Sequence, residues 1–128
     1  MSILTNDFWE SAVSAAKASV PLKRKSDHLV GYIFEFDIDE ASFFFEFHRG
    51  TVNQLPRVPL TGLKGRVHGP LQEWLRVVNG EIPFIRGVNG LHGRLRFEGS
   101  ALENTWASPA LGEFLSIAAS VNKGKTHD

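Results

Sequence analysis

Phenylalanine is concentrated in one short part of this chain: six of its ten phenylalanines lie between Phe34 and Phe47. They belong to two alternating runs that flank a short acidic connection, Tyr32/Phe34/Phe36 and Phe43/Phe45/Phe47. Alternation with a period of two places each run on one face of a β-strand. Two such strands side by side make a broad aromatic wall, which helices, an apolar ligand, or both must cover.

The bulk composition predicts one ordinary folded domain. The chain has 128 residues, of which 42% are hydrophobic and 22% charged, and we expect a single domain over residues 1–122 with a polar tail over 123–128. Fourteen basic residues balance fourteen acidic ones, so the chain has no overall attraction for nucleic acid and no such partner is expected. The absence of cysteine excludes disulfides and thiol catalysis.

The N-terminal sequence and the lengths of the apolar runs predict a cytoplasmic protein. No run approaches the roughly 20 apolar residues that span a membrane. The first ten residues lack the basic start and long apolar core of a signal peptide.

Hydrophobic periodicity gives the expected order of elements. A first helix carries the stripe Trp9, Val13, Ala16 and Val20, and Pro21 should end it, leaving residues 23–25 in a polar connection. Strands are expected over 30–37, 42–49, 51–55, 60–67 and 91–98. A helix should open at Gly69-Pro70 and be closed by Gly80, and a short helical turn is expected at 82–85. A last helix should begin at Ser108-Pro109, where a capping residue precedes a proline.

This order predicts an α+β fold, with helices segregated to one face of a mostly antiparallel sheet. The opposite face of the sheet is expected to be wet, because opposite charges alternate along its strands. The residues expected there are Glu35, Asp37, Glu46, His48, Arg66, His68, Arg94, Arg96 and Glu98.

Four local motifs, in order, resemble the sterol carrier protein 2 (SCP-2-like) family over about residues 30–121. They are Gly31-Tyr-Ile-Phe-Glu-Phe36, then Arg49-Gly50-Thr-Val52 after the second strand, the strand-to-helix passage 63–75, and Gly93-Arg-Leu-Arg-Phe-Glu-Gly99. The resemblance implies a five-stranded sheet with helices on one face. It also implies an enclosed apolar tunnel for lipids, fatty acyl chains or sterols, bordered by the last helix.

Two segments depart from the family pattern at the expected tunnel mouth. Residues 81–91 are longer and richer in glycine, and residues 103–107 lie between the last strand and the expected final helix. The chain ends in Lys-Thr-His-Asp, so a peroxisomal Ser-Lys-Leu address does not carry over.

Large apolar side chains that would face one another across the gap between sheet and helices make up the expected ligand site. They are Phe34, Phe36, Phe43, Phe45, Phe47, Trp74, Phe84, Trp106, Leu111, Phe114 and Leu115. Simple core packing competes with ligand binding about equally for these rings.

No catalytic constellation, cofactor motif or metal motif stands out. His48 and His68 with Glu46 would be the candidates for a metal, but titrating surface histidines are the better interpretation. Glu35 and Glu46 on a solvated face are expected to keep ordinary pKa values. We therefore expect no enzyme and no cofactor.

A non-catalytic carrier for a hydrophobic small molecule is the function that the sequence favours. Two alternatives stay open: an accessory factor or enzyme for a hydrophobic metabolite, and a dimerisation or interaction module that uses the charged sheet face. The expected partners are the small molecule and at most a transient membrane contact, with the chain a monomer or a homodimer.

Overall fold

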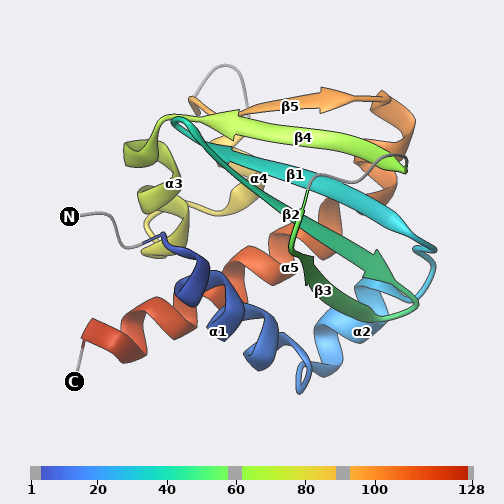
Figure 1. The fold of residues 1–128 in the computed structure, drawn as a ribbon, viewed down its shortest axis with the longest axis horizontal. Coiled ribbons are helices and arrows are strands. Elements are labelled where there is room, and N and C mark those ends of the chain that lie inside the picture. The colour runs from blue at the N-terminus through green and yellow to red at the C-terminus, as the bar shows by residue number, and fades with distance from the viewer. Residues whose placement is uncertain (1–3, 58–61, 89–92, 127–128) are drawn as a thin grey trace.

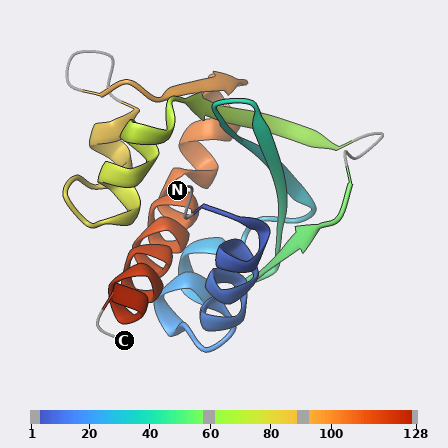
Figure 2. The ribbon, with the colours of Figure 1, turned by 60° about the vertical axis from the view of Figure 1, so that its left-hand side comes forward.

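The computed structural model describes residues 4–57, 62–88 and 93–126. Five strands form one sheet, and the helices pack on one of its faces (Figure 1; Figure 2). The expected strand starts at residues 60 and 91, together with His92 and His127, lie outside the described residues. The α+β architecture expected from the sequence is confirmed.

The sheet is mixed, with one parallel pair in an otherwise antiparallel arrangement. Its strands are β1 (Tyr32–Ile38), β2 (Ala41–His48), β3 (Thr51–Leu55), β4 (Leu63–Gly69) and β5 (Arg96–Gly99). They lie in the order β3-β2-β1-β4-β5, and only the β1–β4 pair among them is parallel. The prediction of a mostly antiparallel sheet is confirmed.

Two helices replace the single N-terminal helix that the sequence predicted. These are α1 (Asn6–Ala16) and α2 (Val20–Ser26). The prediction that Pro21 ends a helix is wrong, because this proline lies in the first turn of α2. A first-turn N–H has no partner within a helix, so proline loses nothing there. Lys23, Arg24 and Lys25 consequently lie on α2 and not in a polar connection.

The last helix begins earlier than predicted. After α3 (Leu71–Val78) and α4 (Phe84–Gly87), α5 runs over Ala101–Thr126. Ser100 caps it, since its Oγ accepts a hydrogen bond of 3.3 Å from the backbone N–H of Glu103. Pro109 therefore lies inside the helix, and residues 103–107 belong to its first turns. The backbone stays helical four residues beyond Asn122, where the polar tail was expected to begin.

Side chains from elsewhere in the fold fix the start of α3. Its N-cap is Pro70, which provides no capping side chain. Instead the Asp39 carboxylate, in the turn between β1 and β2, accepts a hydrogen bond of 3.1 Å from the Leu71 N–H. In the first turn of α3, the buried Glu73 accepts hydrogen bonds of 2.8 Å from the Arg94 N–H and 3.0 Å from the Arg76 guanidinium. These contacts hold α3 in place between the hairpin and the segment that leads into β5.

Helix α5 is the axis around which the other helices are arranged. It crosses behind the sheet, with α1 and α2 on one side of it and α3 and α4 on the other (Figure 1; Figure 2). Each of the four shorter helices contacts it.

Candidate functional site: an apolar groove beside the aromatic core

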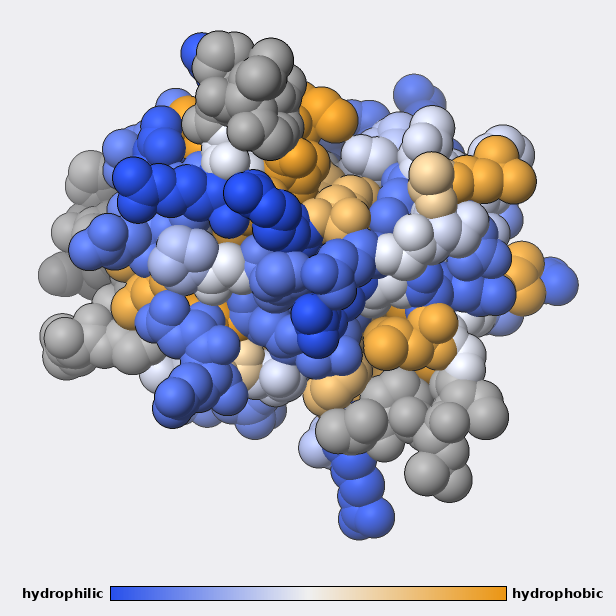
Figure 3. All heavy atoms as spheres, turned by 90° about the horizontal axis from the view of Figure 1, so that it is seen from above, coloured by the Kyte–Doolittle hydropathy of each residue, from blue (hydrophilic) through white to orange (hydrophobic). Residues whose placement is uncertain are grey.

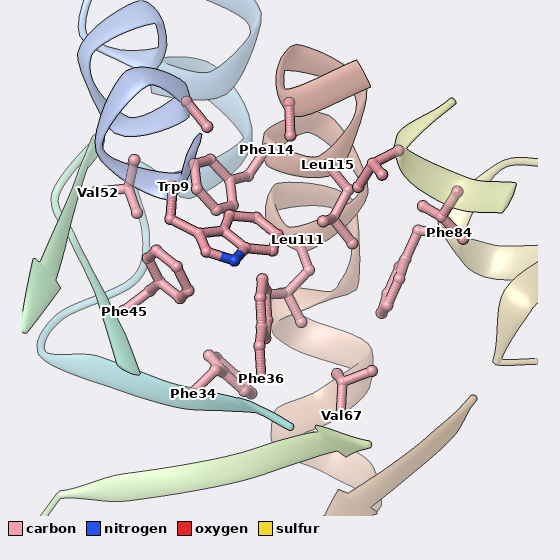
Figure 4. Close-up of a cluster of buried hydrophobic side chains, with 14 of the residues drawn as sticks. Trp9, Phe34, Phe36, Phe45, Val52, Val67, Phe84, Leu111, Phe114 and Leu115 are labelled. Carbon is pink, nitrogen blue, oxygen red and sulfur yellow. The ribbon is translucent and has the colours of Figure 1, made fainter. Parts of the chain in front are cut away.

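The aromatic strands face the helices as predicted, and the side chains there pack closely against one another. Phe34, Phe36, Phe45 and Phe47 have no exposed surface, whereas Phe43 is partly exposed (Figure 4). Phe36 and Phe45 lie 4.9 Å apart, measured between ring centroids, and Phe114 of α5 lies 5.2 Å from Phe45. These are ordinary distances for packed aromatic rings.

Trp9 of α1 occupies the centre of this aromatic cluster. Its ring centroid lies 5.3 Å from that of Phe45, 5.6 Å from Phe36, 6.1 Å from Phe114 and 6.4 Å from Trp74 (Figure 4). The apolar stripe of the first helix includes Trp9, whereas the expected ligand site does not, although that stripe is the signal by which it could be found. Its indole fills the space between the aromatic strands and α5.

The Trp9 indole N–H has no hydrogen-bond partner among the described residues. Two of the rings around it lie steeply inclined to the indole, with interplanar angles of 66° for Phe36 and 85° for Trp74. A weak N–H···π contact is the kind of interaction that such a site offers. The close packing of these rings therefore leaves one buried hydrogen-bond donor, the Trp9 N–H, without a partner, at some cost in the stability of the fold.

A groove of about 670 Å³ lies beside the cluster, between α5 and the segment that joins α3 to α4. This volume is in the range of pockets that hold drug-sized or lipid-like molecules. One wall comes from α3, α4 and their connection, and the other from one face of α5. The lining residues are Lys25, Val77, Gly80, Ile82, Pro83, Phe84, Ile85, Thr105, Ser108, Pro109, Gly112, Leu115, Ser116 and Ala119.

Small side chains on α5 are the reason that this space is open. Ser108, Gly112 and Ser116 recur every four residues, so they share one face of the helix, and all three line the groove. A Cβ atom added to Gly112 would meet no heavy atom within 4 Å. The α5 wall therefore leaves room that a larger side chain would fill.

A close backbone contact holds the opposite wall in place. The Leu95 N–H donates a hydrogen bond of 3.0 Å to the carbonyl of Gly87, at the end of α4. A Cβ atom on Gly93 would collide with the Gly87 carbonyl, so glycine is required for this approach. From α4 the Phe84 ring reaches inward toward α5, and it is almost completely buried (Figure 4).

Polar groups are few in the groove and lie mainly on the α5 side. Of the described residues that line it, only Lys25 is charged, and its Nζ lies 2.7 Å from the Glu113 carboxylate. Thr105, Ser108 and Ser116 contribute hydroxyls. Pro109 has no N–H, so it cannot donate the usual helical hydrogen bond to the Thr105 carbonyl. The groove thus combines an apolar wall with a few polar groups.

The residues expected to bind ligand fall into three groups. Phe84 and Leu115 line the groove. Trp74, Leu111 and Phe114 are buried in the core, as are all the strand phenylalanines of the set except the partly exposed Phe43. The expectation that Trp106 faces the aromatic strands is wrong: 51% of its surface is exposed, and its ring packs edge-on against His28.

A second groove, of about 620 Å³, lies between α1 and strands β2 and β3. Its lining is more polar and includes Asn6, Glu10, Lys17, Asn53 and Arg57. A hydrophobic ligand would have to displace water from these groups, and that displacement opposes binding. The groove between α4 and α5 is therefore the better candidate for an apolar molecule.

The outer face of the sheet carries the charged network that the sequence predicted. Arg66 lies 2.9 Å from Glu98 and 3.4 Å from Asp37, and the His68 imidazole lies 2.8 Å from Glu98. The hydrogen bond from His68 is the main cause that lowers the pKa of Glu98. Seen from above, the β5 edge is mainly hydrophilic, with its apolar side chains in separate patches (Figure 3).

Glu35 on this face departs from the expectation of an ordinary pKa. Its strand partner Phe44 lies on the same face of the sheet and is nearly buried. Burial, followed by a hydrogen bond and charge repulsion from Asp37, raises the pKa of Glu35 to about 7. Neither groove includes Glu35 in its lining, so its shifted pKa by itself indicates no acid–base site.

Neither a metal site nor a membrane-spanning helix is found in the part of the chain that the structure describes. Within residues 4–57, 62–88 and 93–126, no three histidine or acidic side chains come together to hold a metal ion. Over the same residues, no helix has both the length and the apolar character needed to cross a bilayer. The nitrogen Nδ1 of His48, one of the metal candidates, instead accepts a hydrogen bond of 3.0 Å from the Gly31 N–H.

Comparison with known proteins identifies the fold through structure and not through sequence. No protein-family model and no curated protein sequence matches the chain. Its structure is similar to that of sterol carrier protein 2, with a TM-score of 0.73 and 10% identity over 92% of this chain and 98% of the other. A conserved hypothetical protein of Thermus thermophilus, described as possibly a sterol carrier protein, gives a TM-score of 0.70 and 13% identity over 94% and 90%.

A third similar structure is that of a UbiJ-SCP2 ubiquinone synthesis protein. Its TM-score is 0.60 and its identity 13%, over 85% of this chain and 90% of the other. The chain therefore has the SCP2-like fold that its motifs indicated.

Proposed function

We propose that this SCP2-like chain is a non-catalytic carrier that binds a hydrophobic small molecule in the groove between α4 and α5. The observation that supports this proposal most strongly is the groove itself, a largely apolar space of about 670 Å³. Phe84 and Leu115 would contact the ligand directly, and Trp74, Leu111 and Phe114 would form the rigid wall behind them.

The energetics of such a groove suit reversible binding. Burying about 400 Å² of apolar ligand surface contributes roughly 10 kcal/mol. Ordering a flexible chain and losing its free motion removes at least about 4 kcal/mol of this, which leaves at most about 6 kcal/mol, an affinity of roughly tens of micromolar. A carrier needs affinity of this order, because it has to release the molecule that it binds.

Two measurements test the proposal. Native mass spectrometry of gently purified protein should reveal a co-purifying apolar molecule, and a fluorescent fatty acid should bind at about one per chain and be displaced by a natural lipid. The proposal is wrong if neither a co-purifying molecule nor saturable probe binding is found.

Replacing the buried Phe45 by aspartate would be a poor test of the proposal, because an uncompensated carboxylate inside the ring cluster would unfold the chain.

A second candidate function is an accessory role in the synthesis of a hydrophobic metabolite. The similarity to the UbiJ-SCP2 ubiquinone synthesis protein favours it. In this case the groove would present the metabolite to an enzyme, and the chain itself would leave it chemically unchanged. Identification of the extracted molecule separates the candidates, since a biosynthetic intermediate indicates an accessory role and a bulk membrane lipid indicates a carrier.

A further inference from the structure

Strand β3 forms one edge of the sheet, and the second groove runs along that edge (Figure 1). Successive residues of a strand point to opposite faces, yet the three consecutive residues Asn53, Gln54 and Leu55 all line this groove. A groove against one face of the sheet would be lined by every second residue instead. The groove therefore borders the backbone of β3 itself, with α1 as its other wall.

The backbone along this groove has hydrogen-bonding groups that no neighbouring strand uses. A strand in an antiparallel arrangement directs its N–H and C=O groups to both sides in turn, and β3 has a neighbour, β2, on one side only. Among the described residues, no backbone group outside the sheet pairs with the β3 backbone. The pairing of β2 with β3 ends at Phe44, so Ala41, Ser42 and Phe43 pair with β1 alone. The groove thus borders free strand edges of both β3 and β2.

Side chains beside this edge suit the side chains and N–H groups of a peptide. The Gln54 Oε1 atom is buried and has no hydrogen-bond partner among the described residues, while Gln54 Nε2 donates a hydrogen bond to Asn6 Oδ1. A buried acceptor without a donor lowers stability, and a peptide N–H that enters the groove would supply the donor. Phe43 and Leu55 are only partly buried, so they offer apolar contact to the side chains of an added strand.

The charges that line the groove favour an acidic partner. Lys17 of α1 and Arg57, which follows β3, are exposed and make no ion pair among the described residues. Within the described part of the chain, Glu10 is the only acidic side chain of the lining, so cations are in excess there.

A second copy of the chain fits this edge less well than an acidic segment does. It would bring the same lysine and arginine to the contact, and like charges beside an edge strand deter pairing between copies. A small anion would pair with the cations but would leave the backbone groups of β3 unused. An extended segment that has glutamate or aspartate side chains complements both the charge and the free edge.

We propose that the groove between α1 and β3 binds an extended acidic peptide, which adds to the sheet as a further strand beside β3. Backbone hydrogen bonds to the free edge would supply affinity, and the groove would select the alternate side chains that point into it. Strand β3 has five residues, so the paired stretch would be about 17 Å long. The groove between α4 and α5 has no part in this binding, so its failure and the failure of the proposed carrier function are distinguishable.

Fluorescence anisotropy with a defined peptide provides the test. The probe is a fluorescein-labelled hexapeptide of alternating glutamate and valine, because valine favours strands. It should bind saturably at one per chain. The same peptide with lysine in place of glutamate should bind about tenfold more weakly, because its charges repel those of the groove. A glutamate peptide methylated at its backbone nitrogens keeps its side chains but loses its N–H donors, and it should also bind about tenfold more weakly.

Substitutions of exposed charges locate the binding site without disturbing the fold. Lys17→Gln and Arg57→Gln should each weaken binding of the glutamate peptide about threefold to fivefold. Glu10→Gln should strengthen it about twofold, because it removes a like charge. Arg94→Gln is the matched control and should leave binding unchanged, because Arg94 is an exposed cation just before β5, at the opposite edge of the sheet, and makes no ion pair among the described residues.

Three results of the peptide titrations would overturn the proposal. The first is the absence of saturable binding of the glutamate peptide. The second is equal binding of the methylated peptide, which would mean that the groove recognises charge alone. The third is a loss of affinity in Arg94→Gln as large as that in Arg57→Gln. Sedimentation equilibrium adds a further check, because a dimer that the glutamate peptide dissociates would assign this edge to pairing between copies and overturn the proposal as well.

Discussion

Gly112 is the position at which the groove can be filled without disturbing the fold. It lies within α5 on the groove wall, its backbone is not in the left-handed region, and an added Cβ would meet nothing within 4 Å. Gly112→Ala should therefore stabilise the chain by about 0.5–1 kcal/mol, because glycine loses more backbone entropy in a helix than alanine does. The expected rise in melting temperature is about 3–5 °C.

Gly112→Leu should have opposite effects on stability and on binding. Leucine is a good helix former, so the variant should be at least as stable as the parent chain. Its side chain would take the place of about 60 Å² of ligand contact, which corresponds to roughly 1.5 kcal/mol or a tenfold loss of affinity. Chemical denaturation measures the first effect, and displacement of a fluorescent fatty acid measures the second.

Ser120→Leu provides the matched control, since Ser120 is exposed on the same helix and does not line the groove. It should leave probe affinity unchanged. Parent-like affinity in a folded Gly112→Leu variant would refute the assignment of this groove as the binding site. Destabilisation by Gly112→Ala would refute the claim that the helix wall there is open.

Three further predictions concern the scaffold. The pKa of Glu35 is about 7 in the folded chain against 4.5 when unperturbed, so the folded state binds more protons between these values and stability should fall as pH rises from 4.5 to 7. Glu35→Gln should remove this fall in stability with pH and stabilise the chain by up to about 1 kcal/mol above pH 7, a figure already reduced for solvent screening. Chemical denaturation of the variant between pH 4.5 and 7 would show whether the fall persists. Asp39→Ala should lower the free energy of unfolding by about 1–2 kcal/mol, because it removes the hydrogen bond from the Leu71 N–H and because Asp39 has a φ of 53°, which alanine tolerates poorly. Asp39→Asn should lower it less, and equal losses for the two variants in urea melts would contradict this. Phe36→Ala should lower the free energy of unfolding by about 3–5 kcal/mol, because it leaves a cavity in the ring cluster. A loss below about 1 kcal/mol on chemical denaturation would mean that the cluster is loosely packed.

The sheet was predictable because its signals are local. Alternating aromatic residues defined β1 and β2, and the predicted bounds of β3 agree with those of the structure. The partner strands and the one-sided helices followed from the same patterning and from the family resemblance. Such patterns are reliable where one face of a strand must be buried.

The helix boundaries were harder to predict, because the decisive residues are ambiguous in sequence. Ser108-Pro109 is a strong start signal, yet the helix is capped by Ser100 and tolerates the proline well inside its length. Pro21 is typical of a helix end in the sequence, although a proline occupies the first turn of a helix equally well, as it does in α2. A proline limits what can precede it but does not show on which side the helix lies.

The groove could not be predicted from apolar residues, since small side chains create it. Ser108, Gly112 and Ser116 share one helix face only if α5 includes them in a continuous helix. Large rings drew attention to the interior, where Trp9 fills the space. Trp106 shows the same difficulty, because residue type alone does not tell a buried ring from an exposed one.

The most direct measurement is an NMR titration with a fatty acid that carries a nitroxide on its chain. We expect the amide signals of residues 82–85 and 105–116, apart from Pro83 and Pro109, to broaden strongly, while those of the outer charged sheet face, such as Arg66 and Glu98, stay sharp. Broadening centred on the groove between α1 and β3, or none at saturating fatty acid, would contradict the claim that the space between α4 and α5 holds the cargo.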